Sequence, residues 1–300
     1  MKTRNRLIVL FILAFPFVVL FGFLLSQVVG PLPPVQSLPN PNGYEDLVKA
    51  SKMIVNDTGN YNESNLQQLQ KVIDSDSNAL QLARTGLQEQ CRVPLEFSQT
   101  YISNHLAELS SLKQLARTFL AEGQLAELEN RPNDAAKSYL DTIHLGNESA
   151  RGGVLIDALV GIAIQNIGTI HLTNLIAQLD ANSCRETATV LETLDSQRPT
   201  WNEIMQQEKI WRKAFEQLQK VPASKMPMME RMAAKTDQTC ELKFNTQEQK
   251  TRRAMIDLAA RAYELDNGKP PASVADLVPD YLKAVPQDQL TGTNMVYSPR

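Results

Sequence analysis

The most constraining feature of this 300-residue chain is an uncharged apolar stretch near its N-terminus. Residues Leu7 to Val29 contain no charged side chain, and the six residues before them, MKTRNR, carry three positive ones. As a helix rising about 1.5 Å per residue, this stretch would span roughly 34 Å, enough for a hydrocarbon core about 30 Å thick. We therefore expect residues 7–29 to cross a membrane as a single anchor.

A cleaved signal peptide is the competing interpretation of this stretch. Signal peptides usually have an apolar region of about 7–15 residues that ends in small residues at the cleavage site. Here the run is longer and continues into SQVVGP without an Ala-x-Ala pattern, which favours an uncleaved anchor. Positive charges precede it and no charged residue follows until Glu45, so the positive-inside rule predicts a cytoplasmic N-terminus and an exported, periplasmic or equivalent, body.

The composition of the chain is that of a globular protein, with 43% hydrophobic and 21% charged residues. A net charge of −3 provides no basic field for a nucleic-acid backbone, so we expect the lipid bilayer and another envelope protein as partners, and no nucleic acid. Cys91, Cys184 and Cys240 have no metal-ligand spacing. One disulfide between two of them is compatible with an oxidising compartment, and the spacing does not choose the pair.

Residues beyond the anchor divide into three parts. Residues 30–43 are Pro-rich and are expected to form a semi-rigid tether. Residues 44–245 show apolar spacing typical of helices, and residues 246–300 are expected to hold a long helix and a C-terminal module. The fold class is therefore mainly α. Helices are predicted from about 44 to 54 and from 66 to 73, and at about 76–90, 98–122, 132–145, 151–180, 184–195, 200–220 and 245–266.

Two segments of this body allow more than one interpretation. The apolar run from Gly152 to Leu179 has the length of a membrane span, but Asp157, Gly161, Gln165 and Gly168 fall on one helical face, which favours a buried core helix with a closely packed neighbour. Asp157 would then bond to a neighbouring polar group or stay wet at a cleft. The methionine-rich run 224–232 is interpreted as an irregular linker rather than an adaptable binding surface.

The residue types that carry catalysis do not cluster along this chain. His105, His144 and His171 stand apart from one another and from the cysteines, and we expect surface or core roles for them. Glu122, Glu127 and Glu129 are interpreted as a solvated helix face. We therefore predict no catalytic, cofactor-binding or metal-ligating residue. The alternative is an envelope hydrolase with Asp157 and Glu122 in a helical cleft, which would require the two carboxylates about 5 to 9 Å apart.

One helical hairpin resembles a tetratricopeptide unit. Gly123, Ala135 and Tyr139 follow at spacings of twelve and four around an Asn-Arg-Pro-Asn turn, with Phe119 and Tyr139 as the large residues opposite the small one. Glu122 stands at an expected leucine and Asn147 at the terminal proline, so the match is incomplete. An ordinary αα-hairpin is the other interpretation.

The C-terminal forty residues resemble the C-terminal part of the major pseudopilins of type II secretion. That resemblance implies a helix ending at a Leu-Asp-x-Gly turn, a short segment with Leu-Val, and a small antiparallel sheet. The residues that carry it are Tyr263, Leu265-Asp266-Asn267-Gly268, Pro271, Leu277-Val278, Tyr281-Leu282, Pro286, Asp288, Thr291-Gly292 and Tyr297-Ser298-Pro299.

The N-terminus departs from the pseudopilin pattern. It lacks the family's peptidase site and assembly glutamate, and Gln289 follows Asp288 where the family has proline. Neither fibre assembly nor the family's calcium site is therefore expected. The whole chain also resembles uncharacterised membrane-anchored helical proteins of planctomycete-like bacteria.

The C-terminal module also has a purely physical interpretation. Gly268 can end a helix with a positive φ, and the Leu290–Asn294 turn should lead into a short strand at Met295–Tyr297. The apolar stripe that would pack on the body is Val274, Leu277, Val278, Tyr281 and Leu282. Our first hypothesis is a non-enzymatic binding or assembly scaffold anchored in the envelope, and the alternatives are the hydrolase above and a pseudopilin-like secretion component.

Overall fold

The structure is a computed structural model that describes residues 37–55, 65–98, 100–219 and 226–297. The expected anchor at 7–29 and most of the expected tether lie outside these ranges. Within them the protein is mainly α, as predicted. The helices are α2 (Gly43–Met53), α3 (Leu66–Leu87), α4 (Tyr101–Leu128), α5 (Pro132–Glu148), α6 (Leu155–Leu175), α7 (Ala181–Ser196), α8 (Trp201–Gln219) and α9 (Met226–Asn267), with 3₁₀ turns at Ile176–Gln178 and Val274–Leu277.

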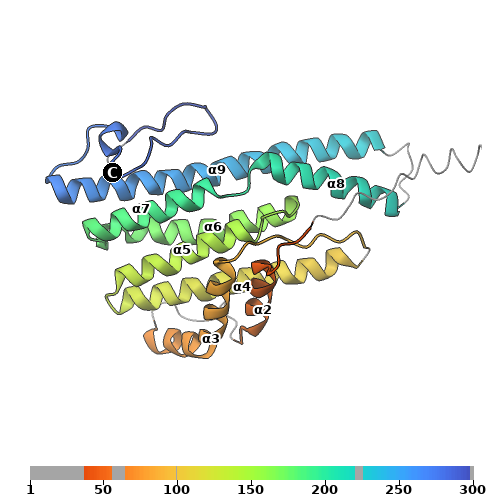
Figure 1. The fold of residues 1–300 in the computed structure, drawn as a ribbon, viewed down its shortest axis with the longest axis horizontal. Coiled ribbons are helices and arrows are strands. Elements are labelled where there is room, and N and C mark those ends of the chain that lie inside the picture. The colour runs from red at the N-terminus through yellow and green to blue at the C-terminus, as the bar shows by residue number, and fades with distance from the viewer. Residues whose placement is uncertain (1–36, 56–64, 99, 220–225, 298–300) are drawn as a thin grey trace, which may run out of the picture.

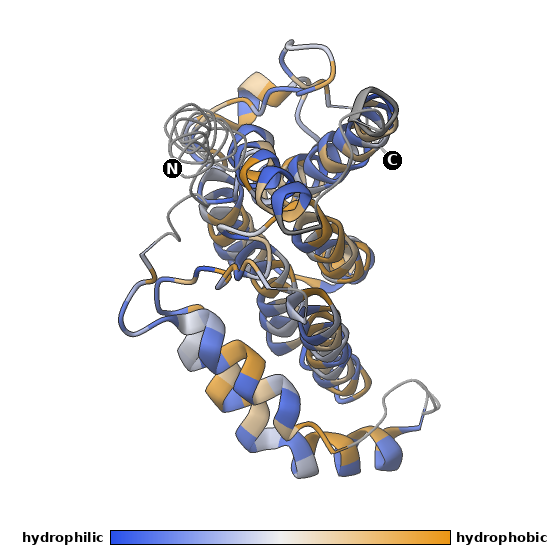
Figure 2. Ribbon diagram, turned by 90° about the vertical axis from the view of Figure 1, so that its right-hand side faces the viewer, coloured by the Kyte–Doolittle hydropathy of each residue, from blue (hydrophilic) through white to orange (hydrophobic). Residues whose placement is uncertain are grey.

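The helices from α4 to α9 lie side by side in a stack (Figure 1). The long helix α9 runs along one edge, α7 and α8 follow each other beneath it, and α6, α5 and α4 come next. Helices α2 and α3 cross this stack at the opposite edge, and the chain after α9 folds back over α9. Figure 2 looks along the axes of the stacked helices and shows that apolar and polar residues are mixed along each of them, as in helices that bury one face.

Several helices begin at residues that satisfy the free N–H groups of a first turn. Side-chain oxygens of Asn42, Asn65 and Asp180 accept hydrogen bonds from Tyr44, Gln68 and Ser183 at 3.3, 3.1 and 2.7 Å. Helix α5 instead starts with Pro132, whose missing N–H is no loss at that position. The helix starts therefore follow local sequence.

Two predicted breaks in the helices are absent. Helix α3 runs unbroken through residues 73–76, and α9 begins at Met226, so most of the segment interpreted as an irregular linker is helical. The early start of α9 has a tertiary cause. Arg212 of α8 donates two hydrogen bonds to Asp237 of α9, at 2.9 and 2.6 Å, and Trp201 packs on Phe244.

Helices α5 and α6 pack closely because glycines remove side chains from their interface. A Cβ added at Gly146 would lie 2.6 Å from the Gly161 carbonyl oxygen, and one added at Gly161 would lie 2.5 Å from the Gly146 oxygen. Gly168 approaches the Tyr139 carbonyl in the same way. Leu155–Gln178 is apolar and long enough to span a membrane, and half of its most apolar window is buried inside the protein. The stripe of small residues thus admits a neighbouring helix, as expected.

Two large apolar clusters hold the described residues together. One contains residues of α2, α3, α4, α5 and α6. The other joins α5, α6, α7 and α9 to the C-terminal module. Val274, Leu277 and Leu282 are buried in the second cluster, as the apolar stripe predicted, and Gly268 has the expected positive φ of 68°. The expected strand at Met295–Tyr297 is wrong. The described residues contain no strand, only a single antiparallel bridge between Gln287 and Asn294, and Val296 has no neighbouring strand to pair with and is exposed.

Candidate functional site

The first sequence-selected carboxylate, Asp157, is fully buried and paired. Its Oδ1 lies 2.5 Å from Nε2 of His105 on α4, and its Oδ2 accepts the Val154 N–H at 2.7 Å. Burial works against a charged imidazole, but the hydrogen bond and charge of Asp157, together with Glu108, raise the pKa of His105. Asp157 therefore bonds to a polar neighbour and is itself closed off from solvent.

Glu122 and Glu127 on α4 do not lie on the solvated face predicted for them, whereas Glu129, directly after α4, is exposed and pairs with Arg131. Glu122 accepts hydrogen bonds from Arg84 and from the Ser138 hydroxyl, and Arg84 also binds Asp141 at 2.8 Å. Glu127 accepts from the Tyr139 hydroxyl. The partners come from α3 and α5, so the spacing along α4 alone was misleading. Asp157 and Glu122 have separate partners, and the structure does not join them in one cleft.

The remaining sequence-selected groups are packing residues in the described chain. Burial lowers the pKa of His144. The ring of His171 packs on the ring of Tyr139, with 5.4 Å between the two ring centres. Cys91, Cys184 and Cys240 are buried, and none is in a disulfide. Gly123 packs directly on Tyr139, since an added Cβ would lie 2.3 Å from the ring. The close approach expected at the α4–α5 hairpin is therefore present.

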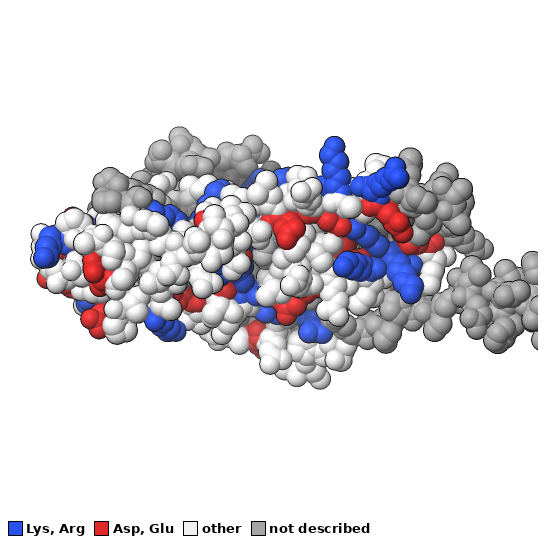
Figure 3. Space-filling view, turned by 90° about the horizontal axis from the view of Figure 1, so that it is seen from above, with Lys and Arg blue, Asp and Glu red and all other residues white. Residues whose placement is uncertain are grey.

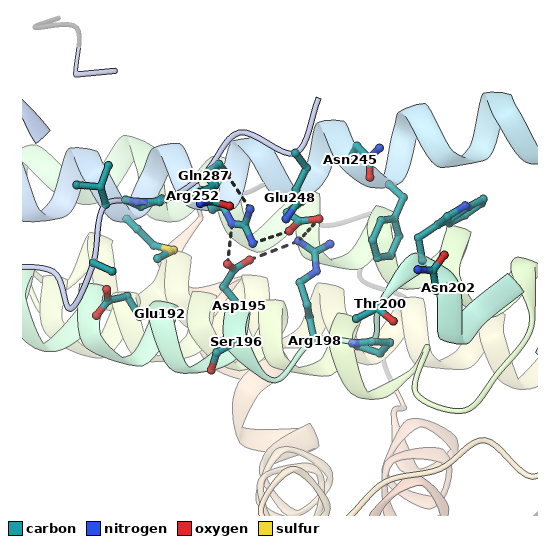
Figure 4. Close-up of a pocket in the computed structure, with 18 of the residues that line it drawn as sticks. Glu192, Asp195, Ser196, Arg198, Thr200, Asn202, Asn245, Glu248, Arg252 and Gln287 are labelled. Atoms are coloured by element: carbon teal, nitrogen blue, oxygen red, sulfur yellow. Dashed lines mark hydrogen bonds and ion pairs between the residues drawn. The ribbon is translucent and has the colours of Figure 1, made fainter. Parts of the chain in front are cut away.

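A concave site lies between the end of α7, the start of α8, the middle of α9 and the chain that folds back over α9 (Figure 4). We call it the Arg198 cleft, and its volume is about 760 Å³. Its lining residues are Glu192, Asp195, Ser196, Arg198, Pro199, Thr200, Trp201, Asn202, Glu241, Phe244, Asn245, Glu248, Arg252, Met255, Lys283, Ala284, Val285, Pro286, Gln287 and Gln289.

Two arginines and two carboxylates form the floor of this cleft. Arg252 binds Asp195 at 2.8 Å and Glu248 at 2.6 Å. Arg198 contacts the same two carboxylates through one nitrogen, Nη1, at 3.4 and 3.5 Å. The charges of the four side chains sum to zero, and each is at least 85% buried, so the network is a polar surface largely screened from water.

The environment of Arg198 disfavours its charge. Only 7% of its side chain is exposed, and its guanidinium carbon lies 4.7 Å from the centre of the Phe244 ring. Burial lowers the pKa of Arg198, although Glu248 and Asp195 act against this. A buried cation that its neighbours do not fully compensate favours an additional acceptor or anion.

The C-terminal module forms one wall of the cleft and is tied to the other elements. Arg252 donates to the Gln287 carbonyl at 2.7 Å, and Gln249 donates to Asp288 at 2.9 Å. The Lys283 N–H donates to Glu192 of α7 at 2.9 Å. The wall is thus held by hydrogen bonds to both α7 and α9, although it contains little regular structure.

Polar side chains are distributed over the rest of the cleft. Asn202 on α8 and Asn245 on α9 both line the cleft, on the two helices that face each other in Figure 4. Thr200 caps α8 through reciprocal hydrogen bonds with Glu203, which fixes the direction in which the chain leaves Arg198. Amides, an aromatic ring and charged groups together can bind a polar organic ligand or a peptide segment.

The network residues of the cleft were missed in the sequence. The available signal was the spacing of Asp195 and Arg198 at i,i+3 and of Glu248 and Arg252 at i,i+4, which favours ion pairs on a helix. Such pairs are common on solvated helices, so the spacing alone does not reveal a cleft. It is the meeting of α7 with α9 that places the four side chains together.

Among the described residues, no group of three or more histidine, cysteine or acidic side chains is arranged to hold a metal ion. Comparison of the chain with protein-family models, with characterised proteins and with solved structures finds no match.

Proposed function

We propose that this chain is a membrane-anchored cell-envelope protein that binds another envelope protein through the Arg198 cleft and acts as a non-enzymatic scaffold. The observation that carries the proposal is the cleft itself. It is a preformed concavity whose four buried charged side chains sum to zero, and its lining also includes the amides of Asn202 and Asn245 and the ring of Trp201. Preformed polar groups lower the entropic loss of binding.

The carboxylates of the cleft favour binding over hydrolysis. Asp195 and Glu248 are both held by Arg252, so their oxygens are engaged in buried ion pairs, whereas a catalytic carboxyl group must reach the substrate. The other acidic pair considered, Asp157 and Glu122, is committed to His105 and Arg84. Because these acidic side chains are already held by arginine or histidine, we prefer a binding protein to a hydrolase.

The location that we propose rests on the sequence. Residues 7–29 would anchor the chain, residues 30–43 would hold the body away from the bilayer, and the positive flank would place the body outside the cytoplasm. Figure 3 shows acidic and basic side chains interspersed over the face formed by α9 and the C-terminal module, so this face carries no broad field of one sign. A protein partner fits such a surface better than nucleic acid.

The finer architectural assignments are also part of this proposal. The α4–α5 hairpin, with Gly123 against Tyr139, is consistent with a tetratricopeptide-like unit. The C-terminal module, with its turn at Gly268 and apolar stripe, would be a reduced pseudopilin-like element that closes the exported body, with the single Gln287–Asn294 bridge where the family has a small sheet. We assign it to forming the cleft wall, because Lys283 and Gln287 contribute hydrogen bonds there.

Photo-crosslinking in the native membrane tests the proposed function. A photo-reactive residue is placed at Asn202 or Asn245 in the cleft, or at Ser77, an exposed position on α3. The expected result is one adduct of the same partner, identified by mass spectrometry, from both cleft positions and not from Ser77. Equal capture from all three positions, or capture of unrelated proteins from the two cleft positions, would refute the proposal.

A further inference from the structure

One edge of the Arg198 guanidinium has no hydrogen-bond partner. Nε and Nη2 of Arg198 are buried and unpartnered, whereas Nη1 reaches Asp195 and Glu248. Leaving a buried charged donor without an acceptor is unfavourable, and here two donors of one group share that condition. Arg198 also lines the cleft, so the unpartnered edge belongs to a residue of the binding site.

The unpartnered edge has the geometry of an oxyanion receptor. The N–H bonds on Nε and Nη2 of a guanidinium are parallel and match the two oxygens of a carboxylate, which gives a bidentate pair with charge-assisted bonds of about 2.7–2.9 Å. The Nη1 contacts at 3.4 and 3.5 Å are long by that standard. They are longer than the contacts of Arg252 at 2.8 and 2.6 Å, and the covered edge must turn towards the cleft for an anion to reach it.

The charges around Arg198 select the kind of anion. Asp195 and Glu248 make their short contacts with Arg252, so they do not fully compensate Arg198. The whole lining nevertheless has four acidic and three basic residues, and a doubly charged phosphate or sulfate would be repelled more than a single carboxylate. The acidic residues are Glu192, Asp195, Glu241 and Glu248, and the basic ones are Arg198, Arg252 and Lys283.

We propose that the Arg198 cleft binds a carboxylate group of its ligand, held by the Nε–Nη2 edge of Arg198. This inference rests on the proposed function and adds the chemistry of the ligand to it. The carboxylate belongs to a peptide, either at its C-terminus or on an aspartate or glutamate side chain. The amides of Asn202 and Asn245 also line the cleft and suit the adjoining peptide groups.

Fluorescence of Trp201 provides a direct assay of carboxylate binding. The chain has two tryptophans, and Trp211→Phe keeps the ring stacking on Phe215 while leaving Trp201, at the cleft, as the only reporter. The full chain in detergent is titrated with N-acetylglycine, whose carboxylate represents a peptide C-terminus, and with N-acetylglycinamide, which is neutral. We expect a saturable signal with the acid and none with the amide.

Variants of Arg198 separate the bidentate edge from charge alone. Arg198→Lys keeps the positive charge without the parallel N–H bonds, and we expect its dissociation constant for N-acetylglycine to rise roughly ten- to a hundredfold. Arg131→Gln, at an exposed ion pair in the turn between α4 and α5, should bind like the parent. Thermal unfolding establishes that each variant is folded. If Arg198→Lys does not fold, the parent's preference for acid over amide and over sulfate decides the question.

Each outcome of the titrations has a defined meaning. Binding of the acid by the parent and its loss in folded Arg198→Lys supports the carboxylate site. Equal binding of acid and amide, tighter binding of sulfate, unchanged binding in Arg198→Lys, or no binding by the folded parent overturns it. Glutarate monoamide, a side-chain analogue, distinguishes the two carboxylate sources. If N-acetylglycine and glutarate monoamide both fail while Asn202 and Asn245 still capture one partner, the ligand chemistry is wrong and the proposed function stands.

Discussion

His105 and Asp157 show how single residues of this protein are stabilised by partners that are distant in the sequence. Both side chains are buried, and they come from α4 and α6. Tyr101 stacks on the His105 ring at 4.9 Å, Glu108 lies 3.7 Å from Nδ1, and the charge of Asp157 also acts on Tyr44 of α2. The cluster therefore connects the protonation of one imidazole to the packing of three helices.

The raised pKa of His105 predicts a pH-dependent contribution to stability. A histidine with a raised pKa binds its proton more tightly in the folded state, so its contribution is complete below its unfolded pKa of about 6.5 and is lost as the pH rises through the folded pKa. The difference in unfolding free energy between the parent and His105→Gln should therefore be largest at acidic pH and shrink as the pH rises. Urea unfolding at several pH values measures it.

His144 provides the control with the opposite sign. Its pKa is lowered by burial, so the unfolded state binds the proton more tightly and the parent loses stability as the pH falls through 6.5. The difference between the parent and His144→Gln should consequently shrink on acidification. A His105→Gln series that follows the same trend as His144→Gln would contradict the assignment of His105.

Arg252 is predicted to be structurally important because it holds both carboxylates of the cleft floor and the Gln287 carbonyl. Removing one member of a buried ion network leaves the others uncompensated, which costs about 3–5 kcal/mol when the site is fully buried. We expect Arg252→Gln, at 15% exposure, to lower the unfolding free energy by about 2–4 kcal/mol in denaturant titrations.

Arg131 is the matched control for Arg252, since it also binds two carboxylates but is 48% exposed. Exposed ion pairs contribute about 0–1 kcal/mol, so Arg131→Gln should have a small effect. If Arg252→Gln and Arg131→Gln lowered the unfolding free energy equally, the ion network of the cleft would contribute no more to stability than an exposed ion pair.

At the scale of elements, the close packing of α5 on α6 depends on glycine. The carbonyl oxygens of Gly146 and Gly161 occupy the positions that side chains would need. We predict that Gly161→Ala destabilises the protein by about 2–4 kcal/mol, because overpacking here must displace backbone and not a flexible side chain. Thermal or denaturant unfolding of the full chain in detergent measures this change.

Gly268 allows the packing effect to be separated from backbone strain. It has a positive φ of 68° but nothing within 4 Å of an added Cβ, so Gly268→Ala introduces strain without a clash. Its cost should be about 1 kcal/mol. If Gly161→Ala proves no more destabilising than Gly268→Ala, the two helices can separate more easily than the structure indicates.

At the scale of the whole molecule, the proposed anchor makes a prediction about the mature chain. The uncleaved protein has a mass of 33.5 kDa, and intact-mass measurement of the protein extracted from membranes should find that mass with MKTRNR retained. A shorter chain that begins near Gly30 would instead indicate a signal peptide. Loss of only the first few residues would favour processing of the pseudopilin type.

The agreement between sequence and structure is best for features that local chemistry controls. Helix α5 begins at Pro132 and α9 ends before Gly268, close to the predicted positions, because proline and glycine act on their own backbone. The stripe of Asp157, Gly161, Gln165 and Gly168 was also recognised, because a helix repeats every 3.6 residues and one face is readable from spacing. Predicted helix ends elsewhere differ by several residues, as at Leu128 and Met226.

The sequence by itself determined that the body is helical, where several helices start and stop, and which face of α6 carries the small residues. Each of these features depends on neighbours within a few residues. Only the tertiary structure decided the partners of the buried charges. Glu122 meets Arg84, Asp157 meets His105, and Arg198 meets Glu248 across helices that are far apart in the chain. A carboxylate on a solvated face and one in a buried network have the same spacing along their own helix. The difference is the helix that packs against them, which is why the Arg198 cleft emerged only from the fold.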